Sequence, residues 1–265
     1  MSMKPVQIIA TIGPVSKEQD IIQQMIQKGM SLARLNFSWG THEEHRQFIV
    51  RIRQAASLLG VQVSIIQDLS GPRVQKETGH TYDESLAVLT DKDKHDLQVA
   101  KDSEVEYVAM SFVASADDIK CLREYLLAQG ITAKIIAKIE RKEALAKLSE
   151  IIASADGVMV ARGDLGQVVP VEEVPFIKKA ILKVAREQGK PSIVATGLLS
   201  SMTDSLEPSR ADVSDITSAV LDGTSALMLS NETATGAHPV ETVATMRKIA
   251  DEALNHITQN NESRF

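Results

Sequence analysis

The sequence predicts a single (β/α)₈ barrel, and three observations lead to that prediction. Eight short apolar runs rich in β-branched residues recur along the chain. Segments with apolar residues at three- and four-residue spacing, a pattern typical of helices, lie between these runs. The chain has 265 residues, close to the roughly 250 that one such barrel uses. A doubly wound open sheet is the alternative, but that fold usually has fewer strands and a glycine-rich first turn. The first turn here reads TIGPVS.

The eight apolar runs are continuous rather than alternating, as strands buried on both faces of a parallel sheet should be. They start at fairly even intervals, with one longer gap between the third and the fourth. The predicted strands are residues 6–13, 31–37, 61–69, 107–112, 133–140, 157–164, 191–197 and 225–230.

The segments between the strands combine an apolar stripe with a polar face. The pattern is clear in residues 20–30, 117–130 and 176–189. The last two end in Gly130 and Gly189, and glycine is the residue that most often follows the end of a helix. Strands that alternate with helices predict parallel βαβ units.

The longer gap contains residues 71–90, which are polar and rich in turn-forming residues. Such a stretch is typical of an active-site loop or of a trimmed insertion. The sequence shows no linker and no repeat beyond the strand–helix unit, so we expect one domain over residues 1–265.

Composition and charge argue against two classes of partner. The net charge is −6 and no long run of lysine or arginine occurs, whereas nucleic-acid binders usually carry a basic face. No apolar run approaches the ~20 residues of a membrane helix. The first residues lack the pattern of a signal peptide, so we expect a cytoplasmic protein with neither a nucleic-acid nor a membrane partner.

Polar residues gather where the predicted strands end, which is where barrels of this kind place their active sites. Alternate residues of a strand face the same side, so Lys138 and Glu140 are expected to line one wall. The polar residues at the strand ends are Arg34, Asn36, Ser38, Asp68, Lys138, Glu140, Arg162, Asp164, Thr196, Ser230 and Glu232.

Glu140 and Asp164 end adjacent predicted strands, with no histidine or cysteine nearby in the sequence. Two carboxylates suit a hard cation such as Mg²⁺ or Mn²⁺, with water and substrate oxygens as further ligands. Glu140 pairing with Lys138 or Arg162 on a solvated rim is the alternative. The glycines of residues 161–166 either expose backbone N–H groups to a substrate carboxylate or serve only the geometry of a turn.

Several of these segments, in their order and spacing, resemble the barrel domain of pyruvate kinases, a single TIM barrel. The resemblance extends over almost the whole chain. The segments are ATIGP (10–14), ARLNFSWG (33–40), QDLSGP (67–72), AKIE (137–140), DGVMVARGDLG (156–166), ATGLLSSM (195–202) and MLSNETATGAHPVE (228–241).

The resemblance implies a role for each site residue. Glu140 and Asp164 would hold the Mg²⁺ that binds phosphoenolpyruvate or pyruvate, and the Gly163 and Asp164 amides would receive the substrate carboxylate. Lys138 would stabilise the transferred phosphoryl group, Arg34 would contact the phosphate, and Thr196 would belong to the relay that protonates the enolate. The residues implied for a K⁺ site are Asn36, Ser38, Asp68 and Leu69.

The chain departs from the family pattern mainly where ADP or ATP would bind. The family inserts a small lid domain after the third strand, where this chain has residues 71–90, and a C-terminal domain follows the barrel. Trp39 replaces a histidine, and it would either stack on a ligand or plug the nucleotide cleft. The further departures are Gln75 for arginine, Gly197 for glutamine, Asn231 for glycine and Thr235 for a lysine of some members.

Three functions are compatible with this pattern. The first is a pyruvate kinase-like enzyme that transfers a phosphoryl group from phosphoenolpyruvate to ADP. The second is a nucleotide-independent lyase with the same site, a pyruvate aldolase or an oxaloacetate decarboxylase. The third is a non-catalytic sensor of phosphoenolpyruvate or pyruvate. Because the family uses the helix at residues 208–223 for self-association, a homo-oligomer is also expected.

Overall fold

The computed structural model describes residues 5–75 and 80–262. Eight strands close into a barrel in the order β1-β10-β9-β8-β7-β6-β3-β2, and each neighbouring pair is parallel. The (β/α)₈ prediction is therefore confirmed. The barrel strands are β1 (Gln7–Thr11), β2 (Met30–Asn36), β3 (Ser64–Asp68), β6 (Tyr107–Met110), β7 (Lys134–Ile139), β8 (Gly157–Ala161), β9 (Ser192–Ala195) and β10 (Ala226–Leu229).

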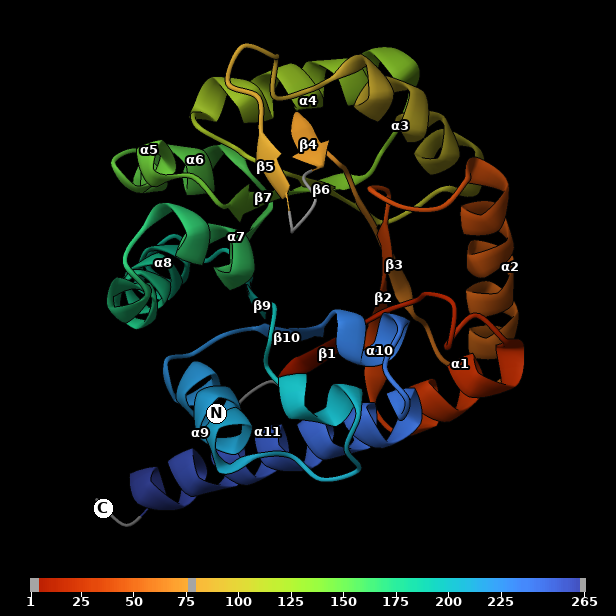
Figure 1. The fold of residues 1–265 in the computed structure, drawn as a ribbon, viewed down its shortest axis with the longest axis vertical. Coiled ribbons are helices and arrows are strands. Elements are labelled where there is room, and N and C mark those ends of the chain that lie inside the picture. The colour runs from red at the N-terminus through yellow and green to blue at the C-terminus, as the bar shows by residue number, and fades with distance from the viewer. Residues whose placement is uncertain (1–4, 76–79, 263–265) are drawn as a thin grey trace.

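Helices surround the barrel on its outside (Figure 1). The helix before β7 and the helix before β9 both end close to the predicted glycines, Gly130 and Gly189, whose φ angles of 71° and 64° lie in the left-handed region. The helices are α1 (Gln19–Gln27), α2 (His42–Leu58), α3 (Asp91–Ser103), α4 (Ala116–Gln129), α5 (Lys142–Leu145), α6 (Leu148–Ser154), α7 (Arg162–Val168), α8 (Val174–Glu187), α9 (Arg210–Leu221), α10 (Asn231–Ala234) and α11 (Pro239–Glu262), with 3₁₀ turns at Val171–Glu173 and Ser200–Thr203.

The continuous apolar runs are explained by two layers of core. One set of strand side chains, including Ile9, Ile66 and Met159, fills the inside of the barrel. The alternate set, including Ile8, Ile65 and Val158, packs outward against the helices. Both faces of each strand are therefore apolar, which fixes the strand ends as the place where polar side chains can gather.

The predicted strand at residues 157–164 is too long. The strand ends at Ala161, and Arg162 begins α7. The apolar run also ends at Ala161, so extending the strand would bury no further apolar side chain. Arg162, Gly163 and Asp164 therefore lie in the first turn of a short helix.

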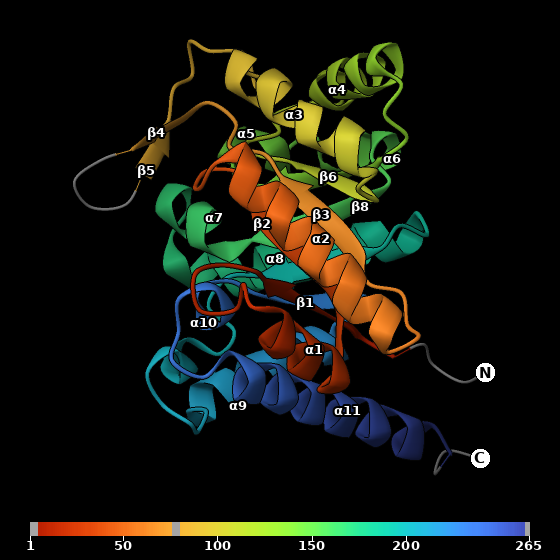
Figure 2. The same cartoon turned by 90° about the vertical axis from the view of Figure 1, so that its right-hand side faces the viewer.

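Residues 71–90 include a small antiparallel ribbon that the sequence did not predict. Its strands are β4 (Arg73–Gln75) and β5 (His80–Tyr82), with Arg73 opposite Tyr82. Residues 76–79, which join them, lie outside the described residues. The ribbon, α7 and α10 lie on one side of the barrel, at the left of Figure 2. Since α7 and α10 directly follow β8 and β10, this is the side of the strands' C-terminal ends.

Within residues 5–75 and 80–262, no helix has both the length and the apolar character needed to cross a membrane.

Candidate active site

Charged side chains at the ends of β2, β3 and β7 form one connected chain of ion pairs. Lys138 Nζ lies 2.6 Å from Ser111 Oγ and 3.0 Å from both Asp68 Oδ1 and Glu140 Oε1. Arg34 Nε donates to Asp68 Oδ2 over 2.7 Å. All four charged side chains are buried. Positive and negative groups alternate along the chain, and this pairing offsets the high cost of burying each ion.

Burial and neighbouring charges shift the pKa values of these groups. Burial acts to raise the pKa of Asp68, but Lys138 and Arg34 together hold it below its ordinary value. Burial acts to lower the pKa of Lys138, and Asp68 and Glu140 raise it above its ordinary value. Burial raises the pKa of Glu140 to about 7, a rise that Lys138 opposes and Asp164 reinforces. Near neutral pH, Lys138 and Asp68 are therefore charged, while Glu140 is divided between its two protonation states.

A strained turn after β6 directs a backbone donor at Glu140. The Phe112 N–H donates to Glu140 Oε2 over 2.6 Å. Phe112 has a φ of 56°, a left-handed conformation that costs a non-glycine residue on the order of 1–3 kcal/mol. Gly71 makes room for this turn, because a Cβ atom at residue 71 would lie 2.9 Å from Phe112 Cδ2. The fold thus holds the Glu140 carboxylate from both sides, by Lys138 and by this amide.

Glu140, which follows β7, and Asp164, in the first turn of α7, face one small cavity. Glu140 pairs with Lys138, while Arg162 pairs with Asp215 of α9. The carboxylates thus line a cavity rather than an exposed rim. The cavity has a volume of about 180 Å³ and is lined by Thr81, Tyr82, Phe112, Glu140, Asp164, Gln167 and Val168.

The two carboxylates are a donor set that fits a hard divalent cation. In the part of the chain that the structure describes, no group of three or more histidine, cysteine, aspartate or glutamate side chains could hold a metal. A cation held by Glu140 and Asp164 would therefore need water or ligand oxygens to complete its shell, which is how Mg²⁺ is usually bound. The residues present fit Mg²⁺ or Mn²⁺.

The first turn of α7 packs directly against the turn that follows β9. Arg162 Nε lies 3.2 Å from the Ala195 carbonyl oxygen, and its Nη2 lies 2.5 Å from that of Thr196. A Cβ atom at Gly163 would lie 2.8 Å from Thr196 Cγ2. Thr196 has a φ of 73°, so this second strained residue is held by contacts from α7. The structure thus brings Gly163 and Thr196 together, as the predicted site requires.

The residues that the resemblance assigns to K⁺ are engaged with protein donors. Ser38 Oγ lies 3.2 Å from Arg73 Nη1, and Asn36 Oδ1 accepts the Ser38 N–H over 3.2 Å. The Leu69 carbonyl accepts from Ser111 over 2.7 Å. The fourth member, Asp68, binds Arg34 and Lys138. Because a guanidinium already contacts this oxygen set, the residues do not fit an additional K⁺.

Three contributors to the site were missed in the sequence. Ser111 is the second-last residue of the fourth predicted strand, YVAMSF, and a polar residue at that position was a usable signal. The Phe112 amide could not be predicted, because every residue except proline has a backbone N–H and the residue type does not show which one donates. Arg73 belongs to residues 71–90, where only a loop was expected.

The sequence model of the family described as "Pyruvate kinase, barrel domain" matches residues 3–88 and 80–243 of the chain. The chain belongs to the pyruvate kinase family. Pyruvate kinase 2 of Synechocystis is 36% identical over an alignment covering 92% of the chain and 56% of that protein. The pyruvate kinase of Geobacillus stearothermophilus is 35% identical, with 94% and 57% covered. The chain thus spans just over half the length of these pyruvate kinases.

The alignment also shows that these pyruvate kinases contain residues that the chain lacks within the matched region. The alignment with the Synechocystis protein runs over 329 positions, whereas the whole chain has 265 residues. The two parts of the family match meet at residues 80–88, inside the segment that holds the β4–β5 ribbon.

Three departures from the pyruvate kinase pattern, Trp39, Asn231 and Thr235, line a second cavity of about 540 Å³ together with Arg34. Trp39 is 57% exposed, and the Arg73 guanidinium carbon lies 5.7 Å from its ring centroid. The cavity stays open beside the indole ring. That Trp39 stacks on a ligand or plugs a nucleotide cleft stays a prediction.

Of the other two departures, Gly197 is not among the described residues that line this cavity. Gly197 has a φ of 68°, which glycine adopts without strain. Gln75 belongs to β4, and its side chain lies outside the described residues.

Proposed function

We propose that this chain is a pyruvate kinase-like enzyme that acts on phosphoenolpyruvate or pyruvate with Mg²⁺ or Mn²⁺ at Glu140 and Asp164. The observation that carries the proposal is the placement of Lys138 between two buried carboxylates, one of which shares a cavity with Asp164. Phosphoryl transfer depends mainly on positioning and on neutralising charge. A divalent cation would supply charge neutralisation at the oxygens of the substrate.

The residues of the chain have separate tasks in this proposal. The Gly163 and Asp164 amides, in the first turn of α7, hold the substrate carboxylate. Lys138 stabilises the phosphoryl group during transfer and then the negative charge of the enolate oxygen. Arg34 contacts the phosphate. Thr196 belongs to the relay that delivers a proton to the methylene carbon of the enolate, which completes pyruvate.

In the first form of this function, the phosphoryl group passes from the enol oxygen of phosphoenolpyruvate to ADP. The second form is a nucleotide-independent lyase with the same metal and lysine. The matched pyruvate kinases contain residues that this chain lacks within the aligned region, which favours the lyase. We propose that the β4–β5 ribbon occupies the position at which relatives insert a lid domain. A lid excludes water during transfer, so its absence would impair a kinase more than a lyase.

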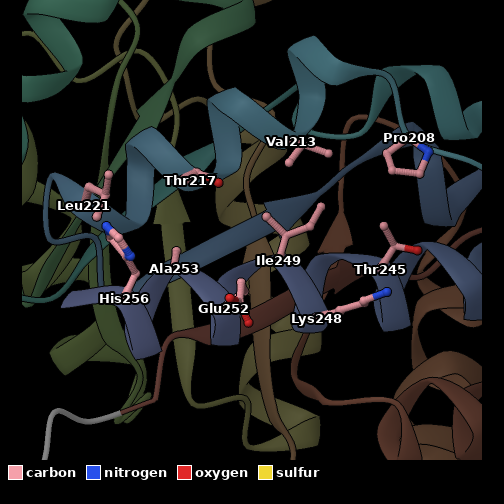
Figure 3. A pocket seen from close by; sticks show the side chains of 10 residues that line it. All are labelled: Pro208, Val213, Thr217, Leu221, Thr245, Lys248, Ile249, Glu252, Ala253 and His256. Carbon is pink, nitrogen blue, oxygen red and sulfur yellow. The ribbon is translucent and has the colours of Figure 1, made fainter. Parts of the chain in front are cut away.

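We also propose that the chain self-associates through α9 and α11. A groove of about 510 Å³ lies between these helices, and Figure 3 shows Val213, Thr217 and Leu221 on one side and Ile249 and Ala253 on the other. Leu221 is half exposed. Leu221→Lys should convert an oligomer to a monomer in light scattering; a monomer at all concentrations before substitution would contradict the proposal.

Oxalate binding tests the proposed site, because oxalate has the two planar oxygens of the pyruvate enolate. We expect oxalate to bind in calorimetry only when Mn²⁺ or Mg²⁺ is present. Glu140→Gln should abolish this binding, since it removes a charged ligand of a hard cation. Glu187→Gln, at an exposed position at the C-terminal end of α8, is the matched control. Oxalate binding without metal, or unchanged binding in Glu140→Gln, would contradict the proposal.

A further inference from the structure

The β4–β5 ribbon is anchored firmly at its base. The Gly71 N–H donates to Oδ1 of the buried Asp93 over 3.0 Å. At the other end of the ribbon, the Asp83 N–H donates to the Pro72 carbonyl over 2.8 Å. Arg73 and Tyr82 are paired in register between these points. The position of Tyr82 is therefore set by backbone contacts as well as by its own packing.

The Tyr82 ring is supported from two directions by residues adjoining Glu140. Its centroid lies 5.1 Å from the centroid of Phe112, whose amide holds Glu140. The Arg141 guanidinium carbon lies 4.4 Å from the Tyr82 ring centroid, within the range of a cation–π contact. Such contacts fix the ring plane, so Tyr82 is held in place beside the carboxylate.

Tyr82 lines the cavity that Glu140 and Asp164 share, and α7 provides its Gln167 and Val168. The Tyr82 hydroxyl donates to Glu84 Oε1 over 3.3 Å, a contact within the ribbon's own segment. The hydroxyl is thus engaged within the ribbon's own segment, and the Phe112 and Arg141 contacts hold the ring. A volume of about 180 Å³ is below the ~300 Å³ at which drug-sized ligand pockets begin.

We propose that Tyr82 is a specificity-determining residue, whose fixed ring restricts the Glu140–Asp164 site to small 2-oxo acids and excludes those with bulky substituents. The inference rests on the proposed function, because it takes the metal-chelating end of the ligand to lie at the two carboxylates. A chelating ligand held there must place the rest of its atoms within the same small cavity. A bulky group would overlap the Tyr82 ring.

Oxamate and N-phenyloxamate form a matched pair of probes, with the same charge and the same chelating oxygens but different bulk. We expect the unaltered chain with Mn²⁺ to bind oxamate at least 30-fold more tightly than N-phenyloxamate in calorimetry. Tyr82→Ala should reduce this ratio at least tenfold. Tyr82→Phe should leave it unchanged, because the ring remains and only the hydroxyl is lost.

The outcomes separate this inference from the function on which it rests. Failure of oxamate to bind with Mn²⁺ would overturn the proposed function and this inference with it. Binding of oxamate with the same ratio in Tyr82→Ala would overturn the inference alone. If Tyr82→Ala does not fold, as judged by thermal melting, Tyr82→Leu takes its place, since it also removes the ring and should lower the ratio.

Discussion

Lys138 has a central place in the charge balance of the site. Asp68, Glu140 and Asp164 carry up to three negative charges against the positive charges of Lys138, Arg34 and Arg73. A divalent cation and a doubly charged anion that bind together leave the net charge of the site unchanged. Either one alone would change that net charge by two units next to buried side chains. Coulomb energies are large where the effective dielectric is low. This coupling is the physical reason to expect oxalate to depend on metal.

The protonation of Glu140 should make metal binding depend on pH near neutrality. Burial raises the pKa of Glu140 from its ordinary value of 4.5 to about 7, and a cation requires the ionised carboxylate. Protons therefore compete with the metal below about pH 7, and Mn²⁺ affinity should fall by up to about tenfold per pH unit there. Above about pH 8 the affinity should level off. Calorimetry with Mn²⁺ at pH 6, 7 and 8 measures this, and a flat profile between pH 6 and 8 would contradict it.

Arg73 should make the site independent of K⁺. Its guanidinium contacts Ser38 Oγ at 3.2 Å, among the oxygens that the resemblance assigns to that ion. We expect Mn²⁺-dependent oxalate binding to be equal in potassium chloride and in tetramethylammonium chloride. Arg73→Ser removes the positive charge and should make the binding require K⁺. A severalfold gain with K⁺ in the unaltered chain would show that the cation binds beside Arg73.

At the scale of elements, the sequence predicted the strands and strand-end residues whose positions depend on burial. It missed the ribbon and Tyr82, whose positions depend on individual contacts. The barrel strands were found because two apolar layers leave a continuous apolar run in each. Lys138 and Glu140 were found because alternate residues at a strand end share a face. The ribbon was missed because each of its strands has three residues, too few for a pattern. The position of Tyr82 depends on Phe112 and Arg141, which no local sequence pattern relates to it.

The contact between α7 and the turn after β9 can be tested by a paired substitution. Gly163→Ala places a methyl group 2.8 Å from Thr196 Cγ2, closer than the backbone can accept without a shift. We expect it to destabilise the fold by about 1–3 kcal/mol, as overpacking does, and to weaken metal-dependent oxalate binding. Urea unfolding and calorimetry measure the two effects.

Adding Thr196→Ser to Gly163→Ala should restore most of the lost stability, because serine lacks the Cγ2 methyl group while keeping the hydroxyl. Thr196→Ser alone is the control for the effect of that substitution. Equal stability of Gly163→Ala and the unaltered chain would mean that α7 can move away from β9 without cost.

At the scale of the whole molecule, two cavities lie at the C-terminal ends of the barrel strands. The small cavity keeps Glu140 and Asp164 of the family motifs. The large cavity contains Trp39, Asn231 and Thr235, which depart from the family pattern. The β4–β5 ribbon connects the two, because it carries Tyr82 at the small cavity and Arg73 beside Trp39. In our proposal, the small cavity holds the enolpyruvate, and the large cavity is where a nucleotide would bind.

This division predicts weak nucleotide binding and slow phosphoryl transfer. The resemblance implies an arginine and, in some members, a lysine where this chain has Gln75 and Thr235. Loss of a charged hydrogen bond to phosphate costs about 1.5–3 kcal/mol, and ~1.4 kcal/mol is tenfold in affinity. ADP should therefore bind only at millimolar concentrations. Exchange of the pyruvate methyl protons should survive better, since in our proposal it needs only the metal, Lys138 and the Thr196 relay.

Both reactions can be measured on one sample, as phosphoryl transfer from phosphoenolpyruvate to ADP and as metal-dependent deuterium exchange into pyruvate.

Lys138→Met should abolish exchange, because it removes the ammonium group that stabilises the enolate. Placing cations at these two positions with Gln75→Arg and Thr235→Lys should tighten ADP binding by at least tenfold. Exchange should stay nearly unchanged, since neither residue has a role in the proposed exchange and Thr235 is not among the described residues that line the small cavity. Rapid phosphoryl transfer at micromolar ADP in the unaltered chain would mean that the β4–β5 ribbon, or a partner subunit, takes the role that we propose for a lid domain.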